Sequence, residues 1–362
     1  MGILEKIADI EREISKTQKN KATEHHLGTL KAKLAKYRQE LIEPKAAKEK
    51  GEGFDVLKSG DARVALIGFP SVGKSTLLNK LTNQVSVAAA YEFTTLTCVP
   101  GKIFYNGATI QLLDLPGIIE GASSGKGRGR QVIACARTSD MILMMLDATK
   151  GEIQRKLLEK ELESVGIRLN KRKPDVSFVL KKGGGQSFVS TCKLTTLTQK
   201  LALSILQQYK IFNCEIIVRE DITVDEFIDV LVGNRKYMSC LYCYNKIDQI
   251  SMEKVEYLAS QPHSLVISSE QDLNLDFLLN RIWKYLQLKR VYTKKRSEYP
   301  DFTEGVIVRK DATVEHFCHS IHRTLADEFK YALVWGKSAK HNPQKVGLSH
   351  LLVDEDVVQI VK

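Results

Sequence analysis

One short loop constrains this chain more than any other feature. Residues 68–75 read Gly-Phe-Pro-Ser-Val-Gly-Lys-Ser and fit the pattern G-x-x-x-x-G-K-[ST] at every fixed position. The apolar run 63–67 precedes the loop as a buried strand would, and the helix-compatible segment 76–81 follows it. Backbone N–H groups at such a turn wrap an anionic phosphate chain. The sequence therefore predicts a phosphate-binding loop; the alternative is a glycine-rich turn that carries a lysine by chance.

Within this loop, each residue type has a chemical reason. The glycines are needed because a Cβ would obstruct the tight turn and the approach of a phosphate. Lys74 is expected to reach the β- and γ-phosphates, and the Ser75 hydroxyl is expected to ligate Mg²⁺. The predicted phosphate-binding residues are Gly68, Phe69, Pro70, Ser71, Val72, Gly73, Lys74, Ser75 and Thr76.

Composition limits the class of protein and suggests a type of partner. The 362 residues have room for two or three domains, and 43% of them are hydrophobic, which suffices for packed cores. No apolar run approaches the roughly 18 residues of a membrane span, and no signal peptide is recognisable. The net charge of +11 favours a polyanionic partner such as RNA or a ribosome; a basic but inert surface is the alternative.

Cysteine usage predicts a reducing compartment, most simply the cytosol. The chain has seven cysteines, an odd number, and they are scattered. Cys240 and Cys243 have C-x-x-C spacing but lie inside an apolar run, so we expect buried strand thiols and no metal or redox site.

Three regions are predicted along the chain. Residues 1–60 carry two helical seams of apolar residues, at 3–14 and 27–41, and then a polar linker; an antiparallel helical hairpin is the simplest arrangement, and packing onto a partner helix is the alternative. Residues 61–288 alternate short strands with helices, which indicates an α/β domain with a mainly parallel sheet and an inserted α+β segment at about 166–235. Residues 289–362 read as a small α+β module.

Particular elements are expected in these regions. The predicted strands of the α/β domain are 63–67, 110–114, 141–147, 240–245 and 265–268. In the insertion, residues 191–209 are predicted to form a helix. In the last region the predicted elements are strands at 306–309, 331–335 and 357–361 and a helix at 314–328.

Two further motifs lie at the ends of predicted strands, where ligands of parallel sheets bind. The residues Asp114, Leu115, Pro116 and Gly117 form a D-x-x-G motif, in which the carboxylate can hold Mg²⁺ through water and the glycine N–H can meet a γ-phosphate. Asn245, Lys246 and Asp248 belong to an N-K-x-D motif. The Asp248 carboxylate can accept hydrogen bonds from N1–H and the 2-amino group of guanine, a donor pair that adenine lacks. The three motifs together predict a guanine nucleotide site.

Two weaker segments complete the predicted site. Phe93, Thr94 and Thr95 lie where a nucleotide-sensing loop belongs, and spacing alone does not choose which threonine completes the magnesium shell. Ser268 and Ser269 end the last predicted strand and could offer a backbone N–H to guanine O6.

These motifs resemble those of Obg-type GTPases. The likeness covers nearly the whole chain and is most specific to the developmentally regulated GTP-binding (DRG) family, in particular its second eukaryotic branch. It includes the segments 17–23, 91–96, 125–131, 329–336 and 341–347. The resemblance implies that Ser75 and Thr95 ligate Mg²⁺, that Asp114 to Gly117 sense the γ-phosphate, and that Asn245 to Asp248 read guanine.

The same resemblance implies domains and partners. Residues 289–362 would form a TGS domain, a ubiquitin-like β-grasp fold associated with RNA and ribosome contact. Residues 61–288 would form the GTPase domain, and the hairpin and the insertion match additions of this family. Family members act with a dedicated regulatory protein and associate with translating ribosomes.

The catalytic group is left open by the sequence. Ile118 stands where Ras-like enzymes carry the glutamine that orients the attacking water, so slow hydrolysis is expected, with Lys74 and Thr95 assisting. A K⁺ ion, a partner acting in trans, or a basic residue at Lys126, Arg128 or Arg130 could replace that glutamine. Ser71 replaces the asparagine of many K⁺-dependent relatives. The competing predictions are a slow GTPase, a GTP-gated RNA- or ribosome-binding scaffold with negligible turnover, and, disfavoured by Asp248, an ATP-using enzyme.

Overall fold

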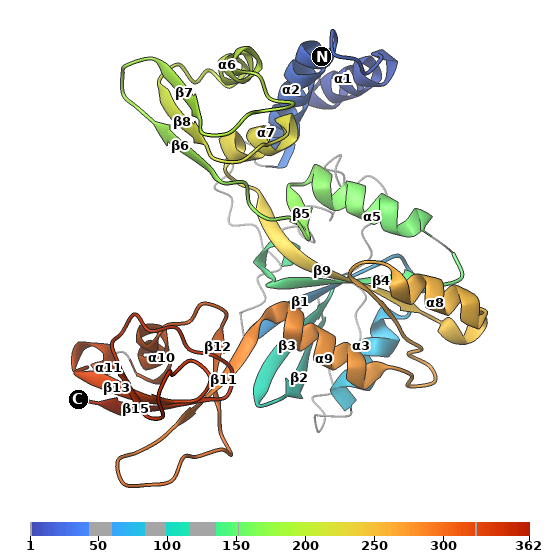
Figure 1. The fold of residues 1–362 in the computed structure, drawn as a ribbon. Coiled ribbons are helices and arrows are strands. Elements are labelled where there is room, and N and C mark those ends of the chain that lie inside the picture. Colours follow the sequence, from blue (N-terminus) through green and yellow to red (C-terminus); the bar gives the residue numbers. More distant parts are fainter. Residues whose placement is uncertain (1, 43–59, 84–98, 116–134, 151, 323) are drawn as a thin grey trace. The chain divides into compact units, whose positions relative to one another are not determined.

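The computed structural model describes residues 2–42, 60–83, 99–115, 135–150, 152–322 and 324–362 (Figure 1). These residues form two compact bodies. The described residues of the hairpin body are 2–42, 135–137 and 152–238, and those of the sheet body are 60–83, 99–115, 138–150, 239–322 and 324–362.

A mainly parallel sheet forms the centre of the sheet body. Its strands follow the order β10-β9-β4-β1-β3-β2, and of the pairs that the structure describes in this sheet only β2–β3 is antiparallel. Their bounds are β1 Ala62–Ile67, β2 Val99–Tyr105, β3 Ala108–Asp114, β4 Met141–Asp147, β9 Lys236–Asn245 and β10 Ser264–Val266. The helices of this part are α3 Lys74–Asn83, the short 3₁₀ turn η2 Ile247–Gln249, α8 Met252–Ser260 and α9 Leu275–Leu286.

The central strands are buried along their whole length, which explains their sequences. Every residue of β1 and of β4 is buried, so both read as continuous apolar runs with no polar alternation. Helix α9 contributes Leu275, Leu278 and Ile282 to the same apolar cluster as Leu77 and Leu81 of α3. The carboxyl ends of the parallel strands therefore meet at one edge of a packed and rigid sheet.

A second, five-stranded sheet in the sheet body follows the order β12-β11-β15-β13-β14. Its strands are β11 Leu288–Thr293, β12 Val306–Arg309, β13 Tyr331–Trp335, β14 Gln344–Val346 and β15 Asp356–Val361, with helices α10 Val314–Ile321 and α11 Thr324–Asp327. Phe317 of α10 is fully buried in the apolar cluster of this module. Arg309 Nη1 donates to Asp140 Oδ1 at 2.8 Å, which ties the module to the turn before β4.

The hairpin body packs two helices against a small α+β unit. Its elements are α1 Ile3–Lys16, α2 Glu24–Ile42, α5 Ile153–Ser164, β5 Ile167–Leu169, β6 Val176–Leu180, β7 Gln186–Ser190, α6 Gln199–Gln208, β8 Cys214–Val218 and α7 Val224–Val232. Strand β8 lies between β6 and β7, and β5 pairs with the first residues of β9. Ala32 of α2 shares a core with Leu201 of α6 and Phe227 of α7.

The contacts of the first two helices confirm an antiparallel hairpin. His26 pairs with Glu13 at 3.0 Å near the turn, and Lys6 lies over the ring of Tyr37 at the far end.

Most predicted strands are confirmed, and two predicted helices are corrected. The helix expected over 191–209 begins only at Gln199, because Thr198 caps it and the hydroxyl of Thr195 bonds instead to Asp221. The helix expected over 314–328 ends at Ile321 because His322 is extended, and a single short turn follows. Cys240 and Cys243 are thiols buried in β9, as predicted.

Candidate functional site

The glycine-rich loop joins the end of β1 to the start of α3 at the carboxyl edge of the main sheet. A Cβ on Gly68 would lie 2.5 Å from the Met145 carbonyl oxygen, and one on Gly73 would lie 2.3 Å from Asn245 Nδ2. Gly73 also has a φ of +95°, and Ser71 has a φ of 64° in the left-handed region. The close packing of this loop on its neighbours therefore requires glycine at both fixed positions of the motif.

The Lys74 side chain folds back over the glycine-rich loop. Its ammonium donates to the carbonyl oxygens of Gly68 at 2.8 Å and Phe69 at 3.0 Å. Burial lowers the pKa of Lys74, and the charge of Asp114 opposes that shift in part. A cation held among backbone groups with little water is well placed to bind phosphate oxygens, since desolvation strengthens its interaction with an anion.

Ser75 and Asp114 bring the first two motifs together. The Ser75 hydroxyl donates to Asp114 Oδ2 at 2.9 Å, because β1 and β3 are neighbours with Leu66 opposite Asp114. The other carboxylate oxygen, Oδ1, is buried and has no hydrogen-bond partner within the described part of the chain. Burial raises the pKa of Asp114, and the Ser75 hydrogen bond and the Lys74 charge offset this only in part. A hydroxyl beside an unsatisfied carboxylate oxygen suits Mg²⁺, a hard cation that prefers oxygen ligands and bound water.

Asn245 connects the phosphate loop to the loop after β10. Its side chain is nearly inaccessible, with 3% of the residue exposed. The amide Nδ2 donates to the Val72 carbonyl at 2.8 Å, while Oδ1 accepts the backbone N–H of Ser269 at 2.9 Å. One side chain thus holds two loops that lie far apart in the sequence.

Asp248 and Lys246 are each oriented by a second residue. Ser268 donates its hydroxyl to Asp248 Oδ1 at 2.7 Å, which fixes the carboxylate at the rim of the site. Lys246 has a φ of 68°, and its ammonium lies 2.8 Å from Asp147 Oδ2. Burial raises the pKa of Asp147, but hydrogen bonds from Lys246 and Thr149 outweigh it, and the pKa falls below its usual value.

The structure adds a residue to the predicted site. Asp147 was not predicted as a site residue, although its position at the end of β4, between the ends of β1 and β9, was a usable signal. Of the two serines that could offer a backbone N–H to guanine O6, Ser269 donates its N–H to Asn245 Oδ1. Ser269 Oγ is buried and lacks a partner among the described residues.

Several predicted residues cannot be placed. Phe93, Thr94, Thr95, Pro116, Gly117, Ile118, Lys126, Arg128 and Arg130 lie outside the described residues. Within the described ranges, no helix is long and apolar enough to cross a membrane, and no group of three or more metal-ligating side chains forms.

Three family models match consecutive parts of the chain. Residues 63–182 match a family described as "50S ribosome-binding GTPase", and residues 183–288 match a family described as the C-terminal region of that same domain. Residues 289–362 match the TGS domain.

Full-length relatives are similar to the whole chain. It is 69% identical to "Developmentally-regulated GTP-binding protein 2" of Homo sapiens over 363 residues, covering 100% of both proteins. It is 64% identical over 363 residues to the protein named its homolog in Dictyostelium discoideum, again with 100% coverage of both. Among solved structures, the Schizosaccharomyces pombe YchF GTPase matches at 13% identity and a TM-score of 0.46, covering 84% of this chain and 99% of that one.

Proposed function

Since the chain belongs to the family of developmentally regulated GTP-binding proteins and is a GTPase with a C-terminal TGS domain, we propose that it is a Mg²⁺-dependent switch that hydrolyses GTP slowly to GDP and phosphate. The switch would act on translating ribosomes, together with a dedicated regulatory protein, in the cytoplasm. The observation that carries the proposal is the Asn245 side chain, which joins the phosphate loop at Val72 to the base loop at Ser269.

Guanine selection is assigned to Asp248. With Ser268 bonded to one of its oxygens, the carboxylate is held in place to accept two hydrogen bonds from a guanine base. The change Asp248→Asn should weaken GTP binding roughly a thousandfold, because two charge-assisted bonds are lost, and should improve binding of xanthosine triphosphate. Calorimetry on the full chain measures both effects. Asp276→Asn, an exposed aspartate of α9, is the matched control, and unchanged GTP binding by the Asp248 variant would contradict the assignment.

Mg²⁺ would be held by the Ser75 hydroxyl and by Asp114 through water, with Thr95 as a further ligand by resemblance to the family. The unsatisfied Oδ1 of Asp114 supports this assignment, because a buried carboxylate oxygen without a partner is costly. When bound, the ion would neutralise charge on the β- and γ-phosphates. Lys74 would exchange its bonds to the loop carbonyls for bonds to phosphate oxygens.

The slow rate is inferred from Ile118, an apolar residue that cannot orient water. The water would be positioned by K⁺ or by a group of the partner protein; the basic residues at 126–130 are the third choice, because they could equally bind RNA phosphates. Single-turnover hydrolysis with K⁺ or Na⁺, and with or without ribosomes, separates the routes. If no condition accelerates hydrolysis, the second candidate replaces the first: a GTP-gated binding scaffold.

Ribosome contact is assigned to the TGS domain and to the basic balance of the chain, +11 overall. Within that domain, Lys345 lies over the ring of Tyr331 at 4.2 Å and Lys294 over Trp335 at 5.3 Å, a combination of cations and aromatic rings that suits RNA. The double change Lys294→Gln and Lys345→Gln should lower co-sedimentation with ribosomes. Lys6→Gln, which alters a similar lysine–tyrosine contact outside the TGS domain, is the control, and equal loss in both variants would refute the assignment.

A further inference from the structure

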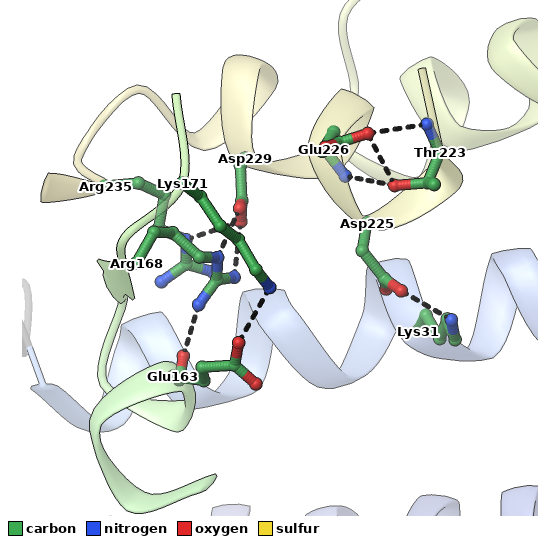
Figure 2. Close-up of polar contacts among 9 residues, drawn as sticks. All are labelled: Lys31, Glu163, Arg168, Lys171, Thr223, Asp225, Glu226, Asp229 and Arg235. Carbon is green, nitrogen blue, oxygen red and sulfur yellow. Dashed lines mark hydrogen bonds and ion pairs between the residues drawn. The ribbon is translucent and has the colours of Figure 1, made fainter. Parts of the chain in front are cut away.

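The hairpin body contains a polar cavity that the nucleotide site does not use. Its volume is about 450 Å³, and it is lined by residues of α2, α5, α7 and the turns beside β5. Figure 2 shows the polar side chains of this region, with Arg168, Asp229 and Arg235 gathered at one end. The size falls within the range of about 300–1,000 Å³ that is typical of small-molecule sites.

Two arginines share one aspartate at the inner end of this cavity. Arg168 donates two hydrogen bonds to the Asp229 carboxylate, from Nε to Oδ2 at 2.6 Å and from Nη2 to Oδ1 at 2.7 Å. Arg235 donates one, from Nε to Oδ1 at 3.0 Å. The three side chains are 3%, 14% and 7% exposed, in the order Asp229, Arg168 and Arg235. Two guanidinium charges are therefore buried against a single carboxylate.

The two arginines differ in how well they are satisfied. Arg168 also donates Nη1 to the Glu163 carbonyl at 2.6 Å, so all three of its nitrogens are bonded. Arg235 uses Nε alone, and its Nη1 and Nη2 have no hydrogen-bond partner in the described ranges. Nη1 lies above Gly166, where a Cβ would come within 2.5 Å of it. The four N–H groups of Nη1 and Nη2 are therefore open to a ligand in the cavity, although only 7% of the side chain is exposed.

The ion pairs around the cavity also single out Arg235. At the cavity wall Lys31 pairs with Asp225 at 2.6 Å, and Lys171 pairs with Glu163 at 2.8 Å, so these cations are neutralised locally. Burial lowers the pKa of Arg168, but Asp229 outweighs that effect and the pKa is raised. Burial lowers the pKa of Arg235 by more than Asp229 restores. Arg235 is thus a buried cation of the cavity that has no carboxylate of its own, and its guanidinium stays protonated in proteins.

We propose that this cavity binds a small molecule that carries a carboxylate group. The Nη1 and Nη2 groups of Arg235 would donate hydrogen bonds to the two oxygens of that carboxylate. A guanidinium matches a carboxylate in planar, two-bond geometry. A single surplus positive charge fits a monoanion. Lys31 and Lys171 on the walls are already paired with Asp225 and Glu163, so they do not supply the second positive charge that a dianionic phosphate or the repeated phosphates of RNA would need.

The experiment follows arginine Nε–Hε signals by NMR in the full chain, titrated with acetate, L-glutamate, inorganic phosphate and chloride at constant ionic strength. The Arg235 signal is identified by its loss in Arg235→Gln. We expect acetate and glutamate to shift this signal saturably, and phosphate and chloride to shift it only in proportion to their concentration. Carboxylate binding, followed on the Arg168 signal, should weaken about tenfold or more in Arg235→Gln.

Arg235→Gln should fold, because Asp229 keeps its two bonds to Arg168 and no carboxylate is left unpaired. Arg235→Lys keeps the charge without the fork and should bind carboxylates with intermediate affinity. Arg172→Gln, whose side chain is 83% exposed outside the cavity, should bind like the parent chain. GTP affinity should be equal in all variants, which separates this test from that of the nucleotide site.

The proposal is overturned if no carboxylate gives a saturable shift, or if Arg235→Gln retains the parent affinity. Stronger binding of a capped peptide with one glutamate side chain than of free glutamate would overturn the small-molecule assignment in favour of a polypeptide ligand.

Discussion

The two polar centres of this chain are built by different means. At the edge of the main sheet, the uncharged side chains of Asn245 and Ser268 position the site through hydrogen bonds, and one carboxylate oxygen of Asp114 is left unsatisfied. In the hairpin body, Asp229 is fully occupied by two guanidiniums, and the unsatisfied group is a cation. Each centre has a buried ionic group without a full set of partners, and the sign of that group indicates the ligand: a cation in the first, an anion in the second.

The largest effect is expected from removing the shared carboxylate of the hairpin body. Asp229→Asn leaves two buried guanidiniums without a counter-charge, which should lower the free energy of unfolding by about 3–5 kcal/mol. Urea unfolding of the full chain, followed by circular dichroism, measures the change. A loss below 1 kcal/mol would mean that the arginines are already neutralised by other groups.

The next largest effect is expected on nucleotide binding, with no change in the free energy of unfolding. Ser75→Asn removes the hydroxyl assigned to Mg²⁺ and should weaken Mg²⁺-dependent GTP binding by about a hundredfold. Ser75 is exposed, so the unfolding transition should stay unchanged. Calorimetry with and without EDTA makes the comparison; equal Mg²⁺ dependence in parent and variant would remove Ser75 from the metal site.

Replacing Asp114 should change ligand binding and protein stability in opposite directions. Its pKa is higher in the folded chain than in the unfolded chain, so the folded state binds the proton more tightly. The stability that this group contributes is present below the ordinary carboxyl pKa and is lost as the pH rises through the raised value. Asp114→Asn should therefore stabilise the ligand-free protein at pH 7, by about 1 kcal/mol or less, while Mg²⁺-dependent GTP binding falls. Thermal melting at pH 5 and pH 7 measures this, and destabilisation at pH 7 would contradict it.

Asp147 provides the reverse case in the same site. Because its folded pKa is lowered, its contribution to stability is present above the ordinary carboxyl pKa and is lost as the pH falls through the lowered value. The two aspartates thus predict opposite slopes of stability with pH in the acidic range.

The smallest effect is expected at the mouth of the hairpin-body cavity. Lys171 pairs with Glu163 at 2.8 Å, but their side chains are 55% and 44% exposed. Solvent screens such a pair, so Lys171→Gln should change the free energy of unfolding by less than about 1 kcal/mol. The urea experiment used for Asp229→Asn gives the comparison, and similar losses in both variants would contradict the distinction between buried and exposed ion pairs.

The first centre could be predicted from sequence, and the second could not, for a physical reason. Parallel strands deliver their loops to one edge, so Ser75, Asp114 and Asn245 are each found in a short continuous motif after an apolar run. The bonds within that site, such as Asn245 to the Ser269 N–H, depend on loop geometry that spacing does not encode.

In the hairpin body, Arg168 lies in β5, Asp229 in α7 and Arg235 in the turn between α7 and β9, and each is an ordinary charged residue in its own segment. An α+β insertion was predicted, but its individual strands were not located because β6, β7 and β8 are short and the two outer ones are half exposed. Thr195 bonds to Asp221 through its backbone N–H and its hydroxyl, which shortens the predicted helix at its start; periodicity does not detect this competition between side chain and backbone.

Calorimetric titration of the full chain with GTP and ATP in the presence of Mg²⁺ tests the central claim most directly. The account predicts that GTP binds with measurable heat and that ATP binds roughly a thousandfold more weakly, because adenine offers Asp248 no pair of donors. Equal affinity for the two nucleotides, or no heat with GTP, would contradict the account.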